Sequence, residues 1–392
     1  MNTRLLQPDI QEYLREHMNA DIPKLLLKGS PFESVTVQEL AQQLVARNKC
    51  KEKLPTWFAT PGIYYPAKLN MEQTSSESTA VYKADLVQGE RLVDLTGGFG
   101  VDSYFFSKRF QRLVHCEMDP ELSGIAAHNF KAMGIENCHF HKGDGIQLLR
   151  DSEQKYDWIY VDPSRRNSAK GKVFQLSDCL PELPLHLPLL FDRAPNILIK
   201  TAPLLDLTMG LSELLGVAEI HIVAVANEVK EVLWLLRRHF KGDVMVRTIN
   251  LLGPRSETFD FLWSEEKEAP LSPGMPDTYL YEPNAAILKA GAFKTMANRL
   301  NVKKLHINSH LYSSDQLLEF PGRRFRIIRV LPYNRKALSA LDIKKANITT
   351  RNFPETVASL RSKFKIADGG NNFLFFTTNM EQEKVVLVCE KI

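Results

Sequence analysis

Cysteine is scarce and unpaired in this sequence. The five cysteines are odd in number and scattered, and no two of them form a CxxC pair. This pattern argues against a disulfide scaffold and against a zinc site. A reducing cytoplasm suits such a chain best, so we expect a cytoplasmic protein that requires no metal. The cysteines are Cys50, Cys116, Cys138, Cys179 and Cys389.

Long uncharged apolar runs are also missing. No run approaches the roughly 20 residues that span a bilayer, and the N-terminus lacks the apolar stretch of a signal peptide. We therefore expect no membrane partner. A net charge of +4 is modest for 392 residues, so the charge of the whole chain does not require nucleic acid as a partner.

The chain is long enough for two or three domains. Residues 1–74 predict a mainly helical region, in which one helix begins with a capping box at Thr36. In residues 75–265, short apolar strands alternate with helical stretches, two of which we expect at 122–133 and 229–240. This alternation predicts an α/β domain with a parallel sheet that is covered on both faces.

The last part of the chain has a different pattern. Residues 264–276 are rich in proline and glutamate, which predicts a linker. Residues 277–392 contain further strand candidates, including 325–330 and a final strand at 385–389. We expect a small α+β domain there.

A strand that ends at Asp94 runs into a turn with three glycines. Glycine has no Cβ, so such a turn can bend tightly and lie against a ligand. Thr96 occupies the place of the first glycine in a dinucleotide-binding turn, which departs from that fingerprint. A helix cap or a turn-forming Asp is the structural alternative for Asp94. The cofactor-binding candidates here are Asp94, Thr96, Gly97, Gly98, Phe99 and Gly100.

Two more strands end in candidate ligands. Glu117 and Met118 end the second strand, about 20 residues beyond the glycine turn, where an acid can accept hydrogen bonds from both ribose hydroxyls. Asp119 precedes a proline and is better suited to cap a helix. Asp144 and Gly145 follow the third strand, where Asp144 is either an adenine ligand or ordinary turn chemistry.

In order and spacing, these segments resemble the class I S-adenosylmethionine (SAM)-dependent methyltransferases over residues 80–260. The stretches 75–83 and 225–231 further resemble a bacterial group with an N-terminal helical region and a C-terminal THUMP-like domain. The resemblance implies a Rossmann-like, seven-stranded core with SAM as cofactor. It also implies that Asp94 holds the amino-acid part of SAM, and that Thr79 and Lys83 are candidates to contact SAM from the segment before the first strand. Surface positions on a helix are the alternative for Thr79 and Lys83.

The same resemblance gives the turn at 162–165 a catalytic role. Amino-methyltransferases use an Asp/Asn-Pro-Pro-aromatic turn, in which the acid and a backbone carbonyl accept the protons of the amine. Here the turn contains Asp162, Pro163, Ser164 and Arg165, and no aromatic residue follows. Arg165, like Arg166, is a candidate to stack on a base or bind a phosphate. Ring nitrogen, carbon and oxygen acceptors therefore stay open.

Local charge indicates a nucleic-acid partner. Residues 299–351 contain twelve basic and three acidic residues, and Phe325, Tyr333 and Phe353 lie among them as candidates to stack on bases. A solvated basic face with core aromatics is the alternative. A second basic and aromatic cluster is either part of a substrate channel or a docking surface; it contains Arg47, Lys49, Lys51, Lys53, Trp57, Tyr64, Tyr65 and Lys68.

The leading hypothesis is a SAM-dependent methyltransferase that acts on a base in structured RNA. One alternative is methylation of a protein or a small molecule. Another is a catalytically silent RNA-binding protein on a methyltransferase scaffold, which the missing aromatic residue after Ser164 keeps open. A dehydrogenase is a distant alternative because the glycine pattern is wrong.

Overall fold

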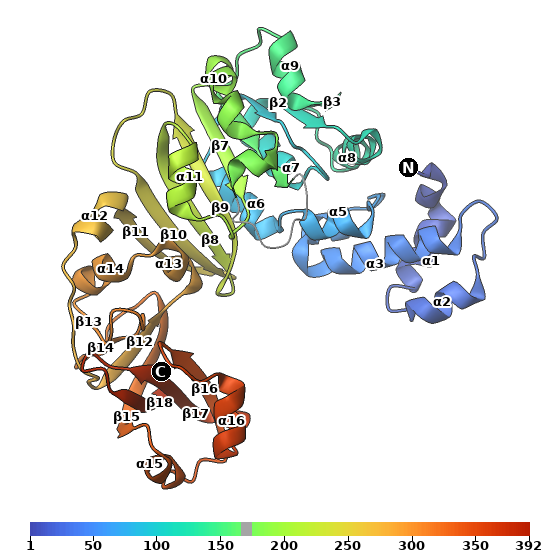
Figure 1. Cartoon of the computed structure of the whole chain (residues 1–392). Coiled ribbons are helices and arrows are strands. Elements are labelled where there is room, and N and C mark those ends of the chain that lie inside the picture. The colour runs from blue at the N-terminus through green and yellow to red at the C-terminus, as the bar shows by residue number, and fades with distance from the viewer. Residues whose placement is uncertain (166–174) are drawn as a thin grey trace. The chain divides into compact units, whose positions relative to one another are not determined.

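The computed structural model describes residues 1–165 and 175–392 (Figure 1). The chain divides into two compact units, of which the first is Met1–Val217 with Leu233–Lys241 and the second is Ala218–Val232 with Gly242–Ile392. The domain boundaries expected near 74 and 265 stay predictions. Within the described ranges, no helix combines the length and the apolar character that crossing a membrane requires.

The N-terminal part of the first unit is helical, as expected. Thr36 caps α3: its side chain accepts from the N–H of Glu39, and the Glu39 carboxylate accepts from the N–H of Thr36. The helices are α1 (Pro8–Glu16), α2 (Ile22–Lys28), α3 (Val37–Lys53), α4 (Pro55–Ala59), α5 (Lys68–Gln73) and α6 (Glu77–Asp85).

Among the described residues, the larger sheet contains nine strands in the order β11-β10-β8-β9-β7-β4-β1-β2-β3. The run from β8 to β3 contains the seven strands of the expected core, and β10 and β11 extend it. The pairs β2–β3, β1–β2, β1–β4 and β4–β7 are parallel. The strands are β1 (Gly89–Asp94), β2 (Phe110–Glu117), β3 (Cys138–Lys142), β4 (Trp158–Val161), β7 (Asn196–Thr201), β8 (Val217–Val225), β9 (Glu228–Arg237), β10 (Met245–Leu252) and β11 (Arg255–Leu262).

The parallel strands are buried because helices cover them. Leu92, Ile159 and Ile199 have no exposed surface, as expected for parallel strands between two layers of helices. Asp119 caps α8, as predicted, and Pro120 is the first residue of that helix. The covering helices are α7 (Val101–Ser107), α8 (Pro120–Ala132), α9 (Gly145–Asp151), α10 (Leu183–Arg193) and α11 (Leu207–Glu213).

The helix predicted at 229–240 is wrong, because this segment is strand β9. Ala226 and Asn227 both have positive φ angles, 49° and 66°, as in the two-residue turn that joins antiparallel strands in a hairpin. The apolar run from Val232 to Leu236 is fully or almost fully buried. A continuous apolar run of this length fits a buried strand as well as a helix, so its periodicity could not decide.

The second sheet, within the second unit, contains seven strands among the described residues, in the order β13-β14-β12-β15-β18-β17-β16. The predicted linker at 264–276 contains the short helix α12 (Trp263–Glu268). The other strands and helices are β12 (Tyr279–Pro283), α13 (Ala285–Ala290), α14 (Phe293–Arg299), β13 (Lys303–Lys304), β14 (Tyr312–Ser314), β15 (Gly322–Pro332), α15 (Arg335–Ser339), β16 (Lys345–Arg351), α16 (Val357–Phe364), β17 (Ala367–Thr378) and β18 (Lys384–Lys391).

Candidate functional site

Polar side chains gather at the carboxyl edge of the parallel strands. Asp94 ends β1, Glu117 ends β2, Asp162 follows β4 and Lys200 lies near the end of β7. Neighbouring strands run parallel here, so their carboxyl ends meet at one edge of the sheet, where open α/β folds bind ligands. The sequence-predicted strand ends therefore come together.

The glycines of the loop after β1 have different environments. A Cβ on Gly97 would lie 2.3 Å from the ring of His115, and one on Gly100 would lie 2.8 Å from Phe130. These two glycines are thus required by protein packing. Gly98 has a φ of 56°, and the nearest atom to its Cβ position lies 4.0 Å away. Gly98 therefore leaves space over the loop, as a ligand-binding turn requires.

Glu117 connects the ends of β1 and β2. Its half-buried carboxylate accepts from the N–H of Gly98 at 2.9 Å and from the N–H of Asp119 at 2.8 Å. A carboxylate has about four lone-pair sites, so two N–H donors leave room for two hydroxyl donors. The side chain of Met118 is 72% exposed and offers an apolar surface beside this group.

Asp94 is buried under the loop. Its carboxylate accepts from Ser103 Oγ at 2.6 Å and from the N–H of Thr96 at 3.0 Å. Burial raises the pKa of Asp94 to about 7, and the nearby charges of Asp102 and Asp162 contribute to the increase. Asp94 thus holds the loop after β1 through the N–H of Thr96. Its contact with a cofactor stays a prediction.

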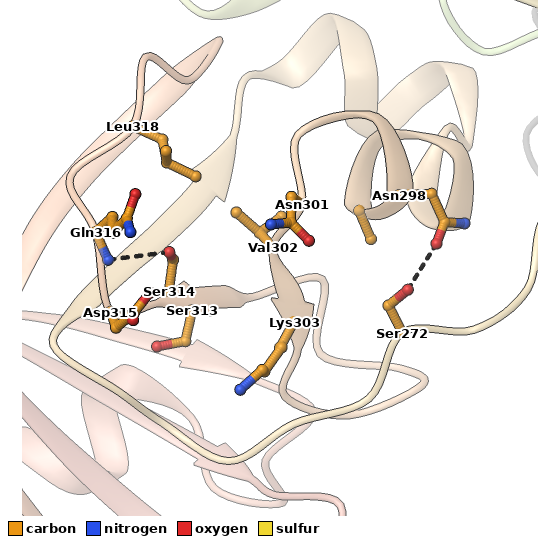
Figure 2. Close-up of a pocket in the computed structure, with 11 residues that line it drawn as sticks. Ser272, Asn298, Asn301, Val302, Lys303, Ser313, Ser314, Asp315, Gln316 and Leu318 are labelled. Carbon is orange, nitrogen blue, oxygen red and sulfur yellow. Dashed lines mark hydrogen bonds between the residues drawn. The ribbon is translucent and has the colours of Figure 1, made fainter.

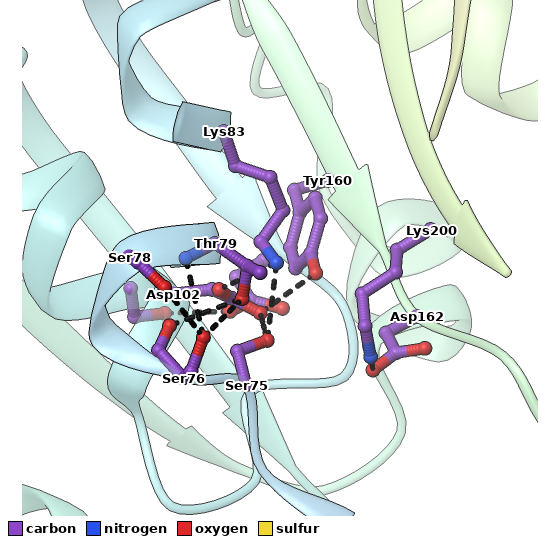
Figure 3. Close-up of polar contacts among 11 residues, drawn as sticks. Ser75, Ser76, Ser78, Thr79, Lys83, Asp102, Tyr160, Asp162 and Lys200 are labelled. Carbon is purple, nitrogen blue, oxygen red and sulfur yellow. Dashed lines mark hydrogen bonds and ion pairs between the residues drawn. The ribbon is translucent and has the colours of Figure 1, made fainter. Parts of the chain in front are cut away.

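A polar network lies between α6 and α7 (Figure 3). Lys83 is fully buried and forms an ion pair with Asp102 at 3.2 Å, and the Asp102 carboxylate also accepts from Tyr160 and Ser75. Burial would raise the pKa of Asp102, but Lys83, Lys200 and the hydrogen bonds together hold it below its usual range. Sequence reasoning missed Asp102 and Tyr160, although both lie within the motifs that it singled out.

Thr79, the other candidate on α6, is also buried. Its hydroxyl donates to the backbone carbonyl of Ser76. Thr79 and Lys83 thus have protein partners in this structure, and their contact with a cofactor stays a prediction. Phe99 is likewise buried, with its ring centroid 6.1 Å from that of Trp57.

The candidate acceptor turn is fixed from two sides. The N–H of Asp162 donates to Thr96 Oγ1 at 2.7 Å, which ties the turn to the glycine loop. The ammonium group of Lys200 donates to Asp162 Oδ2 (Figure 3). Pro163 is buried and Ser164 is exposed. Lys200 was not predicted, although it ends an expected strand.

Beyond Pro163 the chain pairs with a later segment. Ser164 and Arg165 form the short strand β5 (Ser164–Arg165), which is antiparallel to β6 (Cys179–Leu180). The candidate Arg166 lies outside the described residues.

Asp144 caps a helix, whereas its structural alternative in the sequence was a simple turn. Its side chain accepts from the N–H of Ile146 at 2.8 Å and caps α9. A Cβ on Gly145 would lie 2.9 Å from the backbone of Leu95, so this glycine lets α9 begin close to the glycine loop. Asp144 is exposed, and an adenine contact at this position stays a prediction.

The aromatic residues proposed for stacking on bases are mostly structural. Phe325 has no exposed surface and belongs to a hydrophobic core with Phe375, so its proposed stacking role is wrong. Tyr333 and Phe353 pack against a second core. In the N-terminal cluster, Trp57, Tyr64 and Tyr65 are also buried, which favours the docking alternative for these aromatic residues.

Many basic residues of 299–351 have acidic partners. Glu282, almost fully buried, forms ion pairs with Arg323 and Arg351, and Arg299 and Arg324 pair with other glutamates. The local excess of positive charge is therefore smaller than the sequence indicates. Exposed basic residues remain at Arg326, Arg329, Arg335, Lys336 and Lys345.

A separate polar pocket of about 220 Å³ lies within the second unit (Figure 2). Its lining includes a hydrogen bond from Ser272 Oγ to Asn298 Oδ1 at 2.6 Å and one from the N–H of Gln316 to Ser314 Oγ at 3.1 Å. Sequence reasoning did not single out these residues.

Comparisons with known families match the second unit. A model described as a ferredoxin-like domain matches residues 279–321, and a model described as THUMP domain-like matches residues 322–391. The sequence predicts one THUMP-like domain over residues 277–392, and the two family models divide this region.

Relatives extend over more of the chain. One relative is a proposed methyltransferase from Porphyromonas gingivalis W83, whose crystal structure superposes on this chain with a TM-score of 0.88. The two sequences are 34% identical, and the superposition covers 99% of this chain and 98% of that one. An uncharacterized SAM-dependent methyltransferase of Mycobacterium tuberculosis H37Rv is 24% identical over 304 residues, 76% of this chain and 79% of the relative. An uncharacterized RNA methyltransferase of Streptococcus pneumoniae R6 is 26% identical over 207 residues, 52% of this chain and 44% of the relative.

Proposed function

This chain belongs to the class I SAM-dependent methyltransferases that combine an N-terminal helical region with a C-terminal THUMP-like domain, and we propose that it methylates a base in structured RNA. SAM is its cofactor, and methyl transfer is its chemistry.

Three features of the carboxyl edge fit SAM. The open space over Gly98 lets a ligand approach the loop backbone. Glu117 has lone pairs left for the two ribose hydroxyls. The exposed thioether of Met118 offers an apolar surface for the adenine ring. In this assignment Asp94 orders the loop from below, and Asp144 lies at the adenine end.

The observation that carries the acceptor assignment is the hydrogen bond from Asp162 to Thr96. It connects the candidate acceptor turn directly to the loop that would hold the cofactor. SAM supplies a methyl group that is already activated on a sulfonium. The chain therefore needs mainly to position the acceptor, and the carboxylate of Asp162 with the carbonyl of Ser164 would accept hydrogen bonds from an acceptor N–H group.

RNA is the favoured substrate for two reasons. Several relatives carry the name RNA methyltransferase, and the C-terminal region matches a THUMP domain-like model. The exposed basic residues on β15 and α15 offer contacts to phosphates, which supply most of the affinity of non-specific RNA binding.

The first experiment tests cofactor binding at Glu117. Replacing Glu117 by Ala removes two acceptors that would bind the ribose, and each hydrogen bond to a charged group contributes about 1.5–3 kcal/mol. We expect the affinity for SAM, measured by calorimetry, to fall by at least about tenfold, with folding intact. Glu136→Ala, an exposed acid on the same unit, is the matched control and should bind as the wild type does. Equal affinities in both variants would remove Glu117 from the site.

The second part of the experiment identifies the substrate. Protein and radiolabelled SAM are incubated with the RNA, protein and metabolite fractions of cells that lack the gene. We expect label in RNA, lost in Asp162→Ala and kept in Asp192→Ala, an exposed aspartate elsewhere in the first unit. Label in another fraction would refute an RNA substrate. Binding of SAM without label in any fraction would instead indicate a silent RNA-binding protein.

A further inference from the structure

Three carboxylates and two lysines share the inner part of the site. The carboxylates belong to Asp94 on β1, Asp102 on α7 and Asp162 after β4. The lysines are Lys83 on α6 and Lys200 on β7. Their charges interact, because Asp102 and Asp162 both contribute to the raised pKa of Asp94, and Lys83 and Lys200 both lower that of Asp102.

The two lysines are divided between two of the three carboxylates. Lys83 pairs with Asp102 and Lys200 with Asp162. Val161 and Ile199 are register partners on the parallel strands β4 and β7, so the next residues, Asp162 and Lys200, lie side by side. The side chains of Lys200 and Asp162 are 14% and 33% exposed, so water screens this pair less than a surface pair.

Asp94 is more deeply buried than Asp162, and within the described ranges no lysine forms an ion pair with it. Burial and the two neighbouring aspartates raise its pKa to about 7, despite hydrogen bonds from Ser103 and Thr96. Asp162 is close enough to Asp94 for the two carboxylates to interact. Lys53 also lies near Lys200. Burial lowers the pKa of Lys53, and its ammonium group donates to the backbone carbonyls of Met71 and Glu72.

We infer that Lys200 is a positioning residue of the acceptor site, which fixes the carboxylate of Asp162 by a charge-assisted hydrogen bond. The lysine contacts Oδ2, and the carboxylate stays one-third exposed. The group can therefore accept a hydrogen bond from a substrate while Lys200 holds it.

This inference rests on the proposed function, because it assumes that Asp162 receives the proton of the acceptor. The nitrogen of the acceptor forms a bond to the methyl carbon, the carbon–sulfur bond breaks, and its electron pair remains on sulfur. The proton that leaves the nitrogen goes to the Asp162 carboxylate and then to water. Lys200 forms and breaks no covalent bond, and acts on the acceptor through Asp162.

The test compares three variants with the wild type. Lys200→Met removes the charge, Lys200→Arg restores it, and Lys155→Met removes the lysine of another Lys–Asp pair, with Asp192, that is more than half exposed. We measure SAM affinity by calorimetry. We also measure methyl transfer from radiolabelled SAM to total RNA from cells that lack the gene, between roughly pH 5 and 9.

A positioning role predicts a specific pattern. In Lys200→Met, SAM affinity is unchanged, kcat falls by about tenfold to a hundredfold, and the acidic limb of the pH–rate profile moves to higher pH by about one unit or more. Lys200→Arg recovers most of the wild-type profile, and Lys155→Met keeps it. A purely structural role for Lys200 would reduce the amount of folded protein without moving the profile, and that result would overturn the inference.

A second readout does not depend on activity. The carboxyl carbon of Asp162, identified in ¹³C NMR spectra by its absence in Asp162→Asn, should titrate at higher pH in Lys200→Met than in the wild type. If Lys200→Met does not fold, Lys200→Gln keeps a donor without the charge and takes its place. No methyl transfer by the wild type would refute the proposed function, while an unchanged titration would refute the inference alone.

Discussion

At the scale of the residue, the glycines after β1 differ in purpose: two make room for protein side chains, and one leaves open space over the loop. Gly97 and Gly100 make room for buried rings of the protein, and only Gly98 has open space where a side chain would lie. The sequence indicated a glycine-rich turn. It did not indicate which glycine leaves open space over the loop, because His115 and Phe130 approach the turn only in the folded chain.

Gly97→Ala should therefore destabilise the folded protein itself, even when no SAM is bound. The new Cβ would lie 2.3 Å from the buried ring of His115, and overpacking of this kind costs about 1–3 kcal/mol. We expect the midpoint of urea unfolding to fall clearly in the absence of SAM. Gly98→Ala, with only backbone strain of about 1–2 kcal/mol, should lose SAM affinity as well. Equal unfolding midpoints for the wild type and Gly97→Ala would contradict this assignment.

Local chemistry was predictable from the sequence, and partners distant in sequence were not. Asp119 was expected to cap a helix and does so through the N–H groups of Glu121 and Leu122, because a cap depends on neighbours within one turn. Lys200 and Asp162 are 38 residues apart in sequence. Their contact depends on the pairing of β4 with β7, which strand patterns alone do not specify.

At the scale of the element, β9 shows where periodicity fails. Its apolar run is buried on both faces, so it lacks the alternation that identifies a half-exposed strand. The turn at Ala226 and Asn227, where both φ angles are positive, would have identified β9 as a strand. Asparagine favours this conformation, and a two-residue loop of this kind joins antiparallel strands. The start of α3, in contrast, was predictable because a capping box is a local pattern.

Removal of that cap gives a prediction for α3. Thr36→Ala removes the acceptor for the N–H of Glu39, and loss of an N-cap costs typically about 1 kcal/mol. We expect the free energy of unfolding, from urea titration, to fall by about this amount, with no change in SAM affinity. Gln38→Ala, an exposed change in the same turn, should stay near the wild-type value. A larger loss in Gln38→Ala than in Thr36→Ala would show that the cap does not stabilise α3.

At the scale of the whole molecule, ion pairs reduce the positive charge that residues 299–351 present to solvent. Of the basic residues between 299 and 351, several neutralise acids of the same unit, and Lys304 is buried. The sequence therefore overstated the surface available to RNA. The exposed residues on β15 and α15 are the ones on which RNA affinity should depend.

Salt dependence tests this conclusion. Each phosphate contact to single-stranded RNA contributes about 0.7 to the slope of log affinity against log salt. The double change Arg329→Ala and Arg335→Ala should therefore reduce the slope by roughly 1 to 2, measured by fluorescence anisotropy with a structured RNA. Lys24→Ala with Lys28→Ala removes the same charge from exposed sites on α2 and should have less effect. Equal slopes in the two double variants would leave only a general effect of net charge.

The hydrogen bond from Asp162 to Thr96 also bears on inhibitor design. Thr96 Oγ1 accepts the N–H of the acceptor turn from within the glycine loop, so one side-chain rotamer supports both halves of the site. If the glycine loop holds SAM as proposed, a compound that binds there and leaves this rotamer in place competes with SAM alone. A compound that rotates Thr96 away releases the acceptor turn as well, and would inhibit with respect to both substrates.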